Sequence, residues 1–234
     1  NKIGIQTHTQ FKDQADRFQA SLSSNFSYQT NNLPEMATLL TQIVQLAPNA
    51  PEVYTPEGDL NWENSTWSNP FAILENEYQS ESPTLIVNSQ LAYKLLPNLE
   101  FKTNLGYTQI HFNDQYTQPS TGYNPAYGYT AERSRIRKHS SKRNSWLIEP
   151  QLTYSLTWNE FNLNALLGGT LQKNNASQTH LYGIGFYSNR LIENISAAER
   201  QFISLDNATT YKYAALFSRI NFSYRDRYFL NLTG

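Results

Sequence analysis

Residues 146–158 read Trp-Leu-Ile-Glu-Pro-Gln-Leu-Thr-Tyr-Ser-Leu-Thr-Trp, and this stretch decides the fold class. Its two faces differ sharply in polarity. One face carries Trp146, Ile148, Leu152, Tyr154, Leu156 and Trp158, and the other carries Glu149, Gln151, Thr153, Ser155 and Thr157. Such alternation predicts a β-strand with one apolar face.

The length of this strand indicates what covers the apolar face. Trp146 and Trp158 lie 12 residues apart on the same side. At ~3.3 Å per residue they span ~40 Å. A tilt of ~45° projects this to ~28 Å, close to the ~25 Å apolar band of a transmembrane barrel. Globular strands average only about 5–6 residues, so the segment favours a strand that crosses a membrane.

The same alternation recurs along the chain and predicts eight strands, all in an antiparallel all-β fold. The other apolar faces comprise Ile3, Ile5 and Phe11; Phe18, Ala20, Leu22, Phe26 and Tyr28; Leu85, Val87, Leu91, Tyr93 and Leu95; Leu99, Phe101, Leu105 and Tyr107; Phe161, Leu163, Ala165, Leu167 and Leu171; Leu216, Ile220 and Phe222; and Tyr228, Leu230 and Leu232.

The connections between these strands alternate between short and long. Short turns are expected near residues 12–16, 96–98, 159–160 and 225–227, and long loops at roughly 31–83, 115–144 and 173–207. Outer-membrane barrels place short turns in the periplasm and long loops outside the cell. The pattern therefore predicts an orientation as well as a fold class.

Two of the long loops are expected to contain helices. Pro34 suits a first helical turn, and apolar residues from Met36 to Val44 recur at helical spacing. In the third loop, Ser196 and Glu199 fit a capping box.

Composition agrees with a barrel and excludes several other classes. Charged residues make up 16% of the 234 residues, against about 25% in soluble domains. Aromatic residues reach 14%, and there is no cysteine for a disulfide or a thiolate metal site. The net charge of -1 gives no argument for nucleic acid as a partner. No apolar run approaches the roughly 18 residues of a transmembrane helix.

The polar face suggests a barrel of more than eight strands. Its side chains are small, for example Ser21, Ser23, Gly106 and Gly168. An eight-stranded barrel has to fill its own interior with side chains, whereas the widest barrels enclose a plugged lumen. The chain also begins and ends within predicted strands, so we expect residues 1–234 to be one part of a larger barrel domain.

Three motifs resemble one transporter family. The segments are Leu46-Ala47-Pro48-Asn49-Ala50-Pro51-Glu52-Val53-Tyr54, Gly58-Asp59-Leu60-Asn61-Trp62-Glu63-Asn64 and Asn69-Pro70-Phe71-Ala72. Together they resemble a loop of the SusC/RagA-type TonB-dependent transporters of Bacteroidetes. Residues 218–230, from Ser218 to Leu230, resemble a periplasmic hairpin of the same family.

The resemblance spans nearly the whole chain and carries its own expectations. It implies a plugged 22-stranded barrel in the bacterial outer membrane that imports oligosaccharides or peptides with TonB energy. It also implies a SusD-like surface lipoprotein as partner and no cofactor. The plug and the TonB box of the family are not found in this sequence, so contact with TonB is expected through a segment absent here.

A basic cluster in the second long loop is one candidate site. Arg133, Arg135, Arg137, Lys138, Lys142 and Arg143 hold six of the 18 cationic residues. Cations near an anionic membrane surface gain about 1 kcal/mol each, so contact with lipopolysaccharide phosphates is one hypothesis. Contact with a partner lipoprotein is a second, and a solvated loop is the third.

Loop aromatics form the other candidate site. The residues are Trp62, Trp67, Tyr116, Tyr123, Tyr127 and Tyr129. Aromatic faces stack on sugars and are enriched at interfaces. Packing of the loops on each other or on a partner would explain the same residues.

No catalytic or metal-binding motif is recognised, so the chain is not expected to be an enzyme. The four histidines are scattered, and nucleophile, phosphate-binding and dinucleotide motifs are absent. Two other functions remain open. One is a secreted β-rich carbohydrate-binding protein, and the other is a structural or secretion-associated outer-membrane barrel.

Overall fold

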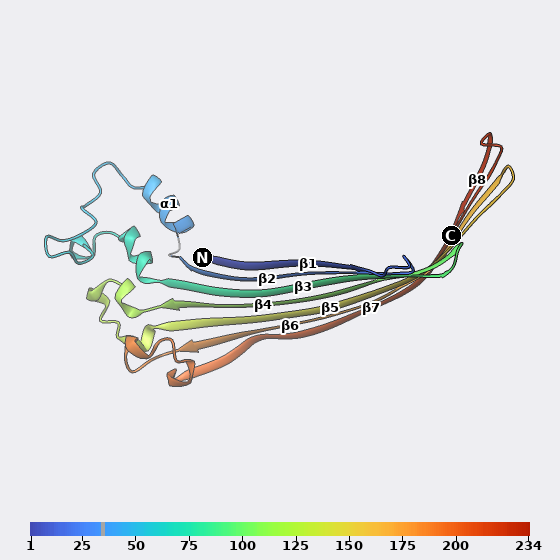
Figure 1. The fold of residues 1–234 in the computed structure, drawn as a ribbon. Helices are drawn as coiled ribbons and strands as arrows, with labels where there is room; N and C mark the ends of the chain where they lie inside the picture. Colours follow the sequence, from blue (N-terminus) through green and yellow to red (C-terminus); the bar gives the residue numbers. More distant parts are fainter. Residues whose placement is uncertain (34–35) are drawn as a thin grey trace.

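The chain folds into one antiparallel sheet of eight strands in which every strand pairs with its sequence neighbours (Figure 1). The computed structural model describes residues 1–33 and 36–234. The strands are β1 (Lys2–Lys12), β2 (Phe18–Leu33), β3 (Glu77–Leu96), β4 (Leu99–Gln118), β5 (Arg135–Trp158), β6 (Phe161–Ile184), β7 (Arg200–Tyr224) and β8 (Tyr228–Thr233), and the α-helix is α1 (Met36–Val44). The eight predicted strands are thereby confirmed.

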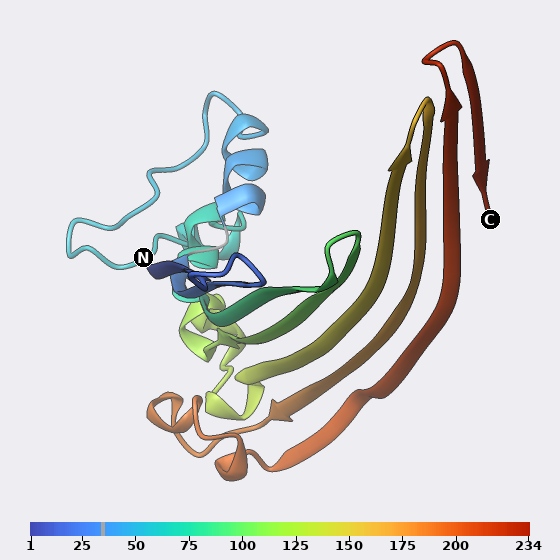
Figure 2. The same cartoon turned by 45° about the vertical axis from the view of Figure 1, so that its right-hand side comes forward.

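All long loops gather at one end of the sheet and all short turns at the other (Figure 1). The predicted order of short and long connections is confirmed. The sheet is strongly curved, and it does not close, because β1 and β8 form its two edges (Figure 2). None of the helices in the described part of the chain is long and apolar enough to cross a membrane.

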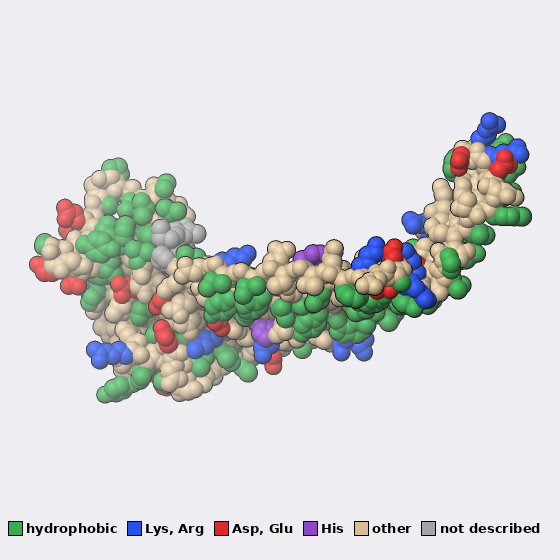
Figure 3. Space-filling model, in the orientation of Figure 1, with side chains coloured by type: hydrophobic (Ala, Val, Ile, Leu, Met, Phe, Trp, Pro, Cys, Tyr) green, Lys and Arg blue, Asp and Glu red, His purple; other side chains and the backbone are tan. Residues whose placement is uncertain are grey.

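The register defines two faces that continue across the whole sheet. Residues paired across antiparallel strands point to the same side. Trp146 pairs with Tyr107 on β4, and Leu163 pairs with Leu156 on β5 and Phe222 on β7. The hydrophobic side chains gather on the convex side of the curved sheet (Figure 3). We call this side the apolar face and the concave side the polar face.

The apolar face is not covered by a second sheet. Phe26 is 43% exposed, Ile148 37% and Leu167 58%, and Leu91 and Leu163 are only half-buried. A β-sandwich would bury these side chains together between two sheets. The structure therefore leaves an apolar band open toward the outside of the curve, as the alternation predicts.

The apolar band stops well before the loops begin. Past Tyr107 on β4 the same face continues with Gln109, and past Trp146 on β5 it continues with Asn144. The hydrogen-bonded ladder nevertheless runs on to Gln118. Strands β3 to β7 are 20 to 25 residues long, so they extend beyond the apolar band toward the loop end.

The long loops are therefore shorter than the sequence predicts. They occupy residues 119–134 and 185–199, and the described part of the first loop is residues 36–76. The prediction of a loop over 115–144 is wrong at both ends, because each side of it belongs to β4 or β5. Most of the basic cluster therefore lies on a strand.

The predicted loop helices are confirmed in one case and wrong in the other. Helix α1 forms as predicted, while Pro34 lies outside the described residues. The third loop has two short 3-10 turns, Asn189–Leu191 and Ile195–Ala197, and the second lies where the capping-box helix was predicted. Asn194, rather than Ser196, caps this turn by accepting from the Ser196 backbone N–H at 3.1 Å. Strand β7 begins too soon afterwards for a longer helix.

The small inward residues make room for close contacts. A Cβ atom at Gly168 on β6 would lie 2.5 Å from two ring carbons of Phe217 on β7. These two residues are partners in the register. The glycine thus lets an aromatic ring lie flat across the polar face.

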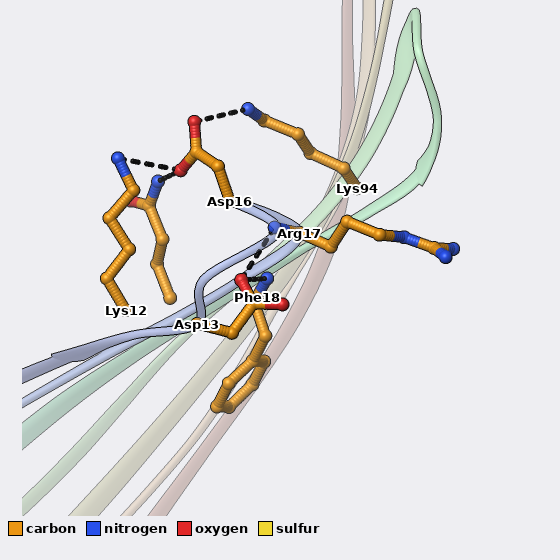
Figure 4. A network of polar contacts seen from close by, with 7 residues as sticks. Lys12, Asp13, Asp16, Arg17, Phe18 and Lys94 are labelled. Carbon is orange, nitrogen blue, oxygen red and sulfur yellow. Dashed lines mark hydrogen bonds and ion pairs between the residues drawn. The ribbon is translucent and has the colours of Figure 1, made fainter.

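Acidic side chains fix the first short turn (Figure 4). Asp13 Oδ1 accepts hydrogen bonds from the backbone N–H groups of Arg17 at 2.7 Å and Phe18 at 2.8 Å. Asp16 pairs with Lys12 at 2.7 Å and with Lys94 of β3 at 3.2 Å. Hydrogen bonds from Lys12, Lys94 and Gln19 lower the pKa of Asp16 to about 2.

Candidate functional site

The predicted basic and aromatic residues meet at the loop end of β4 and β5. Tyr129 contacts Tyr123 edge-to-face and Tyr127 in a tilted arrangement, each with 5.5 Å between ring centroids. The guanidinium carbon of Arg133 lies 4.8 Å from the centre of the Tyr129 ring. Arg135 donates a hydrogen bond to the Tyr123 hydroxyl at 3.2 Å.

One same-face position further along β5, a second arginine lies over a tyrosine ring. Tyr116 of β4 and Arg137 of β5 are register partners. The guanidinium carbon of Arg137 lies 5.6 Å from the centre of the Tyr116 ring. We call this set the arginine–tyrosine ladder: Tyr116, Tyr123, Tyr127, Tyr129, Arg133, Arg135 and Arg137. Two groups that the sequence suggests separately thus form one cluster.

The strand-borne part of the ladder lies on the polar face. Arg135 and Arg137 have the parity opposite to that of Trp146 on β5. The partner of Arg137 on β6 is Tyr182, whose ring stacks on Phe202 of β7 at 5.3 Å and 5°. Neither Tyr182 nor Phe202 was singled out from the sequence, because their proximity to Arg137 depends on strand register.

The pleat of β5 places the remaining cations of the predicted cluster on opposite faces of the sheet. Arg143 is on the polar face, closer to the middle of the sheet. Lys138 and Lys142 are on the other side, above the apolar band. Lys173 pairs with both Trp146 and Lys212, so two lysines face each other at the edge of this band. The cluster therefore divides into two surfaces of different surroundings.

None of the six predicted cations pairs with a carboxylate in the described part of the chain. The ion pairs found there join Lys12 and Lys94 to Asp16, Arg225 to Glu160, and His139 to Asp114. Arg135, Arg137, Lys142 and Arg143 are also exposed. Their charge is thus available to an external anion.

A polar row below the ladder was not expected from the sequence. Asp114 of β4, His139 of β5 and His180 of β6 are successive register partners on the polar face. The Asp114 carboxylate lies 2.9 Å from His139 Nδ1, and the two histidine rings are 4.4 Å apart. The described residues contain no group of three side chains suited to hold a metal ion.

Trp62 and Trp67 belong to the first loop and make none of the ring contacts that define the ladder in the described part of the chain. The Trp67 indole donates to the backbone oxygen of Asn61 at 3.1 Å, and Trp62 precedes the 3-10 turn Glu63–Ser65. Both indoles are half-buried. Packing within the loop accounts for Trp67.

Polar side chains tie the three loops together. Asn189 of the third loop accepts from the Ser134 hydroxyl at 2.6 Å and exchanges hydrogen bonds with Ser120 of the second. Asn124 donates to Ser65 of the first loop at 2.9 Å. Asn124 and Ser134 are buried. The loops therefore form a crosslinked layer, with a small apolar core around Ile136.

A cavity of about 810 Å³ crosses the strands between the ladder and the apolar band. Most of the residues that line it are of polar types, among them Glu81, Asn113 and Lys138. These three lie on the same side of the sheet as the apolar band, so polar side chains replace apolar ones on this side toward the loops.

This architecture matches solved structures of a bacterial importer. The RagAB peptide importer in its open-open state matches with a TM-score of 0.72 at 15% identity, over 99% of this chain and 27% of that one. The same importer in its closed-closed state matches with a TM-score of 0.67 at 14% identity, over 99% and 27%.

The fold is that of the barrel wall of a TonB-dependent transporter.

A second transporter type agrees with this assignment. The siderophore receptor PiuA from Acinetobacter baumannii matches with a TM-score of 0.53 at 13% identity, over 99% of this chain and 34% of that one. The chain spans about a quarter of the length of the RagAB chain, so the barrel wall is represented by an open segment. No protein-family model and no curated protein matches the sequence. The predicted resemblance to a TonB-dependent transporter is confirmed at the level of the fold.

Proposed function

We propose that this chain forms part of the wall and the extracellular mouth of a bacterial outer-membrane transporter that imports a nutrient with TonB energy. The observation that carries the proposal is the pair of opposite faces. An apolar band of membrane height is open on the convex side, and a polar surface lines the concave side. In a barrel the first faces lipid and the second faces a lumen.

The full barrel in this proposal has about 22 strands. The fold match supports it, because the match covers 99% of this eight-stranded chain but only 27% of the RagAB chain. The plug and the contact with TonB are assigned to parts of the transporter outside these eight strands. The short turns face the periplasm and the long loops face the exterior.

The substrate is proposed to be a peptide or an oligosaccharide, and the crosslinked loop layer is proposed to receive it together with a SusD-like lipoprotein. Exposed ladder aromatics such as Tyr127, which is 60% exposed, support a role in contact. Tyrosine side chains are common anchors at interfaces. The proposed role is transport rather than catalysis.

Contact with lipopolysaccharide is proposed for the cations of the membrane side, Lys138, Lys142, Lys173 and Lys212. Like charges directly opposite each other destabilise a sheet, so the Lys173–Lys212 pair favours an anion between or above the two ammonium groups. Lys173 and Lys212 lie at the edge of the apolar band, level with Trp146, where lipid phosphates lie, and Lys142 and Lys138 lie further toward the loops on the same side. Arg133, Arg135 and Arg137 do not share this position.

The proposal is tested by uptake in cells. Cells producing the intact protein should import labelled peptides or oligosaccharides, and deletion of the TonB gene or dissipation of the proton gradient should abolish import. The protein should also sediment with outer membranes and require detergent for extraction. A protein that is soluble without detergent would instead support the secreted carbohydrate-binding function. Membrane insertion without TonB-dependent uptake would support a structural or secretion-associated barrel.

A further inference from the structure

The polar face of β5 presents an unusual series of side chains below the loops. Every second residue from Arg135 to Arg143 points to the concave side: Arg135, Arg137, His139, Ser141 and Arg143. Same-face residues along a strand recur at about 6.6–6.8 Å. The series thus descends about 27 Å, from the ladder to the level of Asn144, just above the girdle residue Trp146. We call Arg135, Arg137 and Arg143 the β5 cationic row.

The charges of this row are not neutralised within the described part of the chain. None of the three guanidinium groups takes part in an ion pair there. On the same face, the Asp114 carboxylate lies 2.9 Å from His139 Nδ1 and forms no ion pair with an arginine in the described part of the chain. All three arginines are exposed. A row of like charges on a sheet is unfavourable unless an anion joins it.

Aromatic rings hold the upper arginines in place. Tyr116 lies beneath Arg137, and the Tyr123 hydroxyl accepts a hydrogen bond from Arg135. Tyr182 flanks Arg137 on the opposite side and stacks on Phe202. A guanidinium group above a ring face keeps N–H groups available for hydrogen bonds to a carboxylate. The arginines are therefore oriented before a ligand arrives.

We propose that the β5 cationic row and its flanking tyrosines are a binding track for an extended ligand that carries carboxylates at alternate positions. An extended peptide has the same repeat as the strand, so acidic residues at every second position match the spacing of Arg135 and Arg137. The ligand class is accordingly an acidic peptide rather than a neutral one. This inference rests on the proposed import function and specifies its substrate.

The test uses the intact protein in detergent and three fluorescent probes. The first is an octapeptide of alternating Asp and Ser, the second replaces each Asp by Asn, and the third is an oligogalacturonate of similar length. Binding is measured by fluorescence anisotropy at two salt concentrations. The Asp peptide should bind at least 10-fold more tightly than the Asn peptide, and higher salt should reduce this preference. Tighter binding of the oligogalacturonate would overturn the peptide assignment.

Two matched variants locate the site. Arg135→Ala/Arg137→Ala removes two cations from the polar face, and Lys138→Ala/Lys142→Ala removes two cations of the same strand from the other face. The first should weaken binding of the Asp peptide about 10-fold or more, and the second should change it less than 2-fold. Equal weakening by both variants, or equal binding of the Asp and Asn peptides, would overturn the proposal.

Uptake separates this inference from the function on which it rests. Wild-type cells are supplied with labelled pools of peptides and of oligosaccharides, with and without TonB. If TonB-dependent uptake occurs but the Asp peptide does not bind, the track is wrong and the import function stands. If neither pool is taken up in a TonB-dependent way, the import function itself fails.

Discussion

An arginine at position 167 is the most informative single change in this sheet. Leu167 of β6 lies on the apolar face and is 58% exposed. It is six residues from Phe161, the first residue of the strand. At ~3.3 Å per residue and a tilt of ~45°, this places it ~14 Å above the girdle, near the middle of a ~25 Å band. Leu166, the preceding residue, points to the polar face and provides a matched control.

Leu167→Arg should lower the free energy of unfolding several-fold more than Leu166→Arg. An arginine on the lipid side at the bilayer midplane destabilises a barrel by about 2–4 kcal/mol, while a lumen position tolerates polar residues. Leu167→Arg should therefore reduce the ratio of folded to unfolded protein by about 30-fold or more, since 1.4 kcal/mol is a factor of ten. Leu166→Arg should change it much less.

The assay is guanidinium-induced unfolding of the intact protein in phospholipid vesicles, followed by tryptophan fluorescence and by the heat-dependent shift in gel mobility. Both variants carry the same added charge and differ only in the side of the sheet. A larger loss of stability for Leu166→Arg than for Leu167→Arg would refute the assignment of the two faces.

Three further predictions concern other parts of the chain. The depressed pKa of Asp16 means that its contribution to stability is present above about pH 4 and is lost as pH falls toward 2; Asp16→Asn should remove this part of the acid dependence of unfolding. Lys173→Glu should reduce lipopolysaccharide retained after purification, measured by mass spectrometry, whereas Lys102→Glu on the polar face should leave it unchanged. Asn189→Ala removes the third-loop side chain that accepts hydrogen bonds from Ser120 and Ser134 of the second loop, and it should destabilise the loop layer by about 1–3 kcal/mol. Limited proteolysis would then cleave residues 119–134 sooner; cleavage at the wild-type rate would contradict this role.

The membrane-facing part of the fold was predictable because two constraints act together there. Lipid requires apolar residues on one side, and the lumen permits polar residues on the other. Because successive side chains of a strand point to opposite faces, apolar and polar residues then alternate along the sequence. Trp146, Leu152 and Trp158 carry the signal on β5, and the register shows all three on one face.

The loop-side ends of the strands were missed for a physical reason. Above the band both faces meet water, so Lys138, His139, Ser140 and Ser141 show no alternation. Backbone hydrogen bonds continue the ladder there without any requirement on side-chain polarity. The sequence therefore predicts a loop over roughly 115–144, where the structure continues β4 to Gln118 and begins β5 at Arg135.

The site was predictable as a set of residue types but not as an arrangement. Clusters of Arg and Tyr are visible in the sequence, and the structure brings Tyr116 and Arg137 together. Their contact depends on a register in which residues 21 positions apart become partners. The same register separates Lys138 from Arg137 by placing them on opposite faces. A sequence cluster of cations therefore does not identify one surface.

The central claim is that one face of each strand contacts lipid and the other contacts water, and spin-label accessibility along β5 tests it directly. The chain has no cysteine, so single cysteines can be placed at each position from 151 to 156 and labelled in the intact protein in outer-membrane vesicles. Labels at positions 152, 154 and 156 should collide mainly with dissolved oxygen, and those at 151, 153 and 155 mainly with a water-soluble nickel chelate. Equal exposure of all six positions to the nickel chelate, or protection of the even positions from both reagents, would contradict the account.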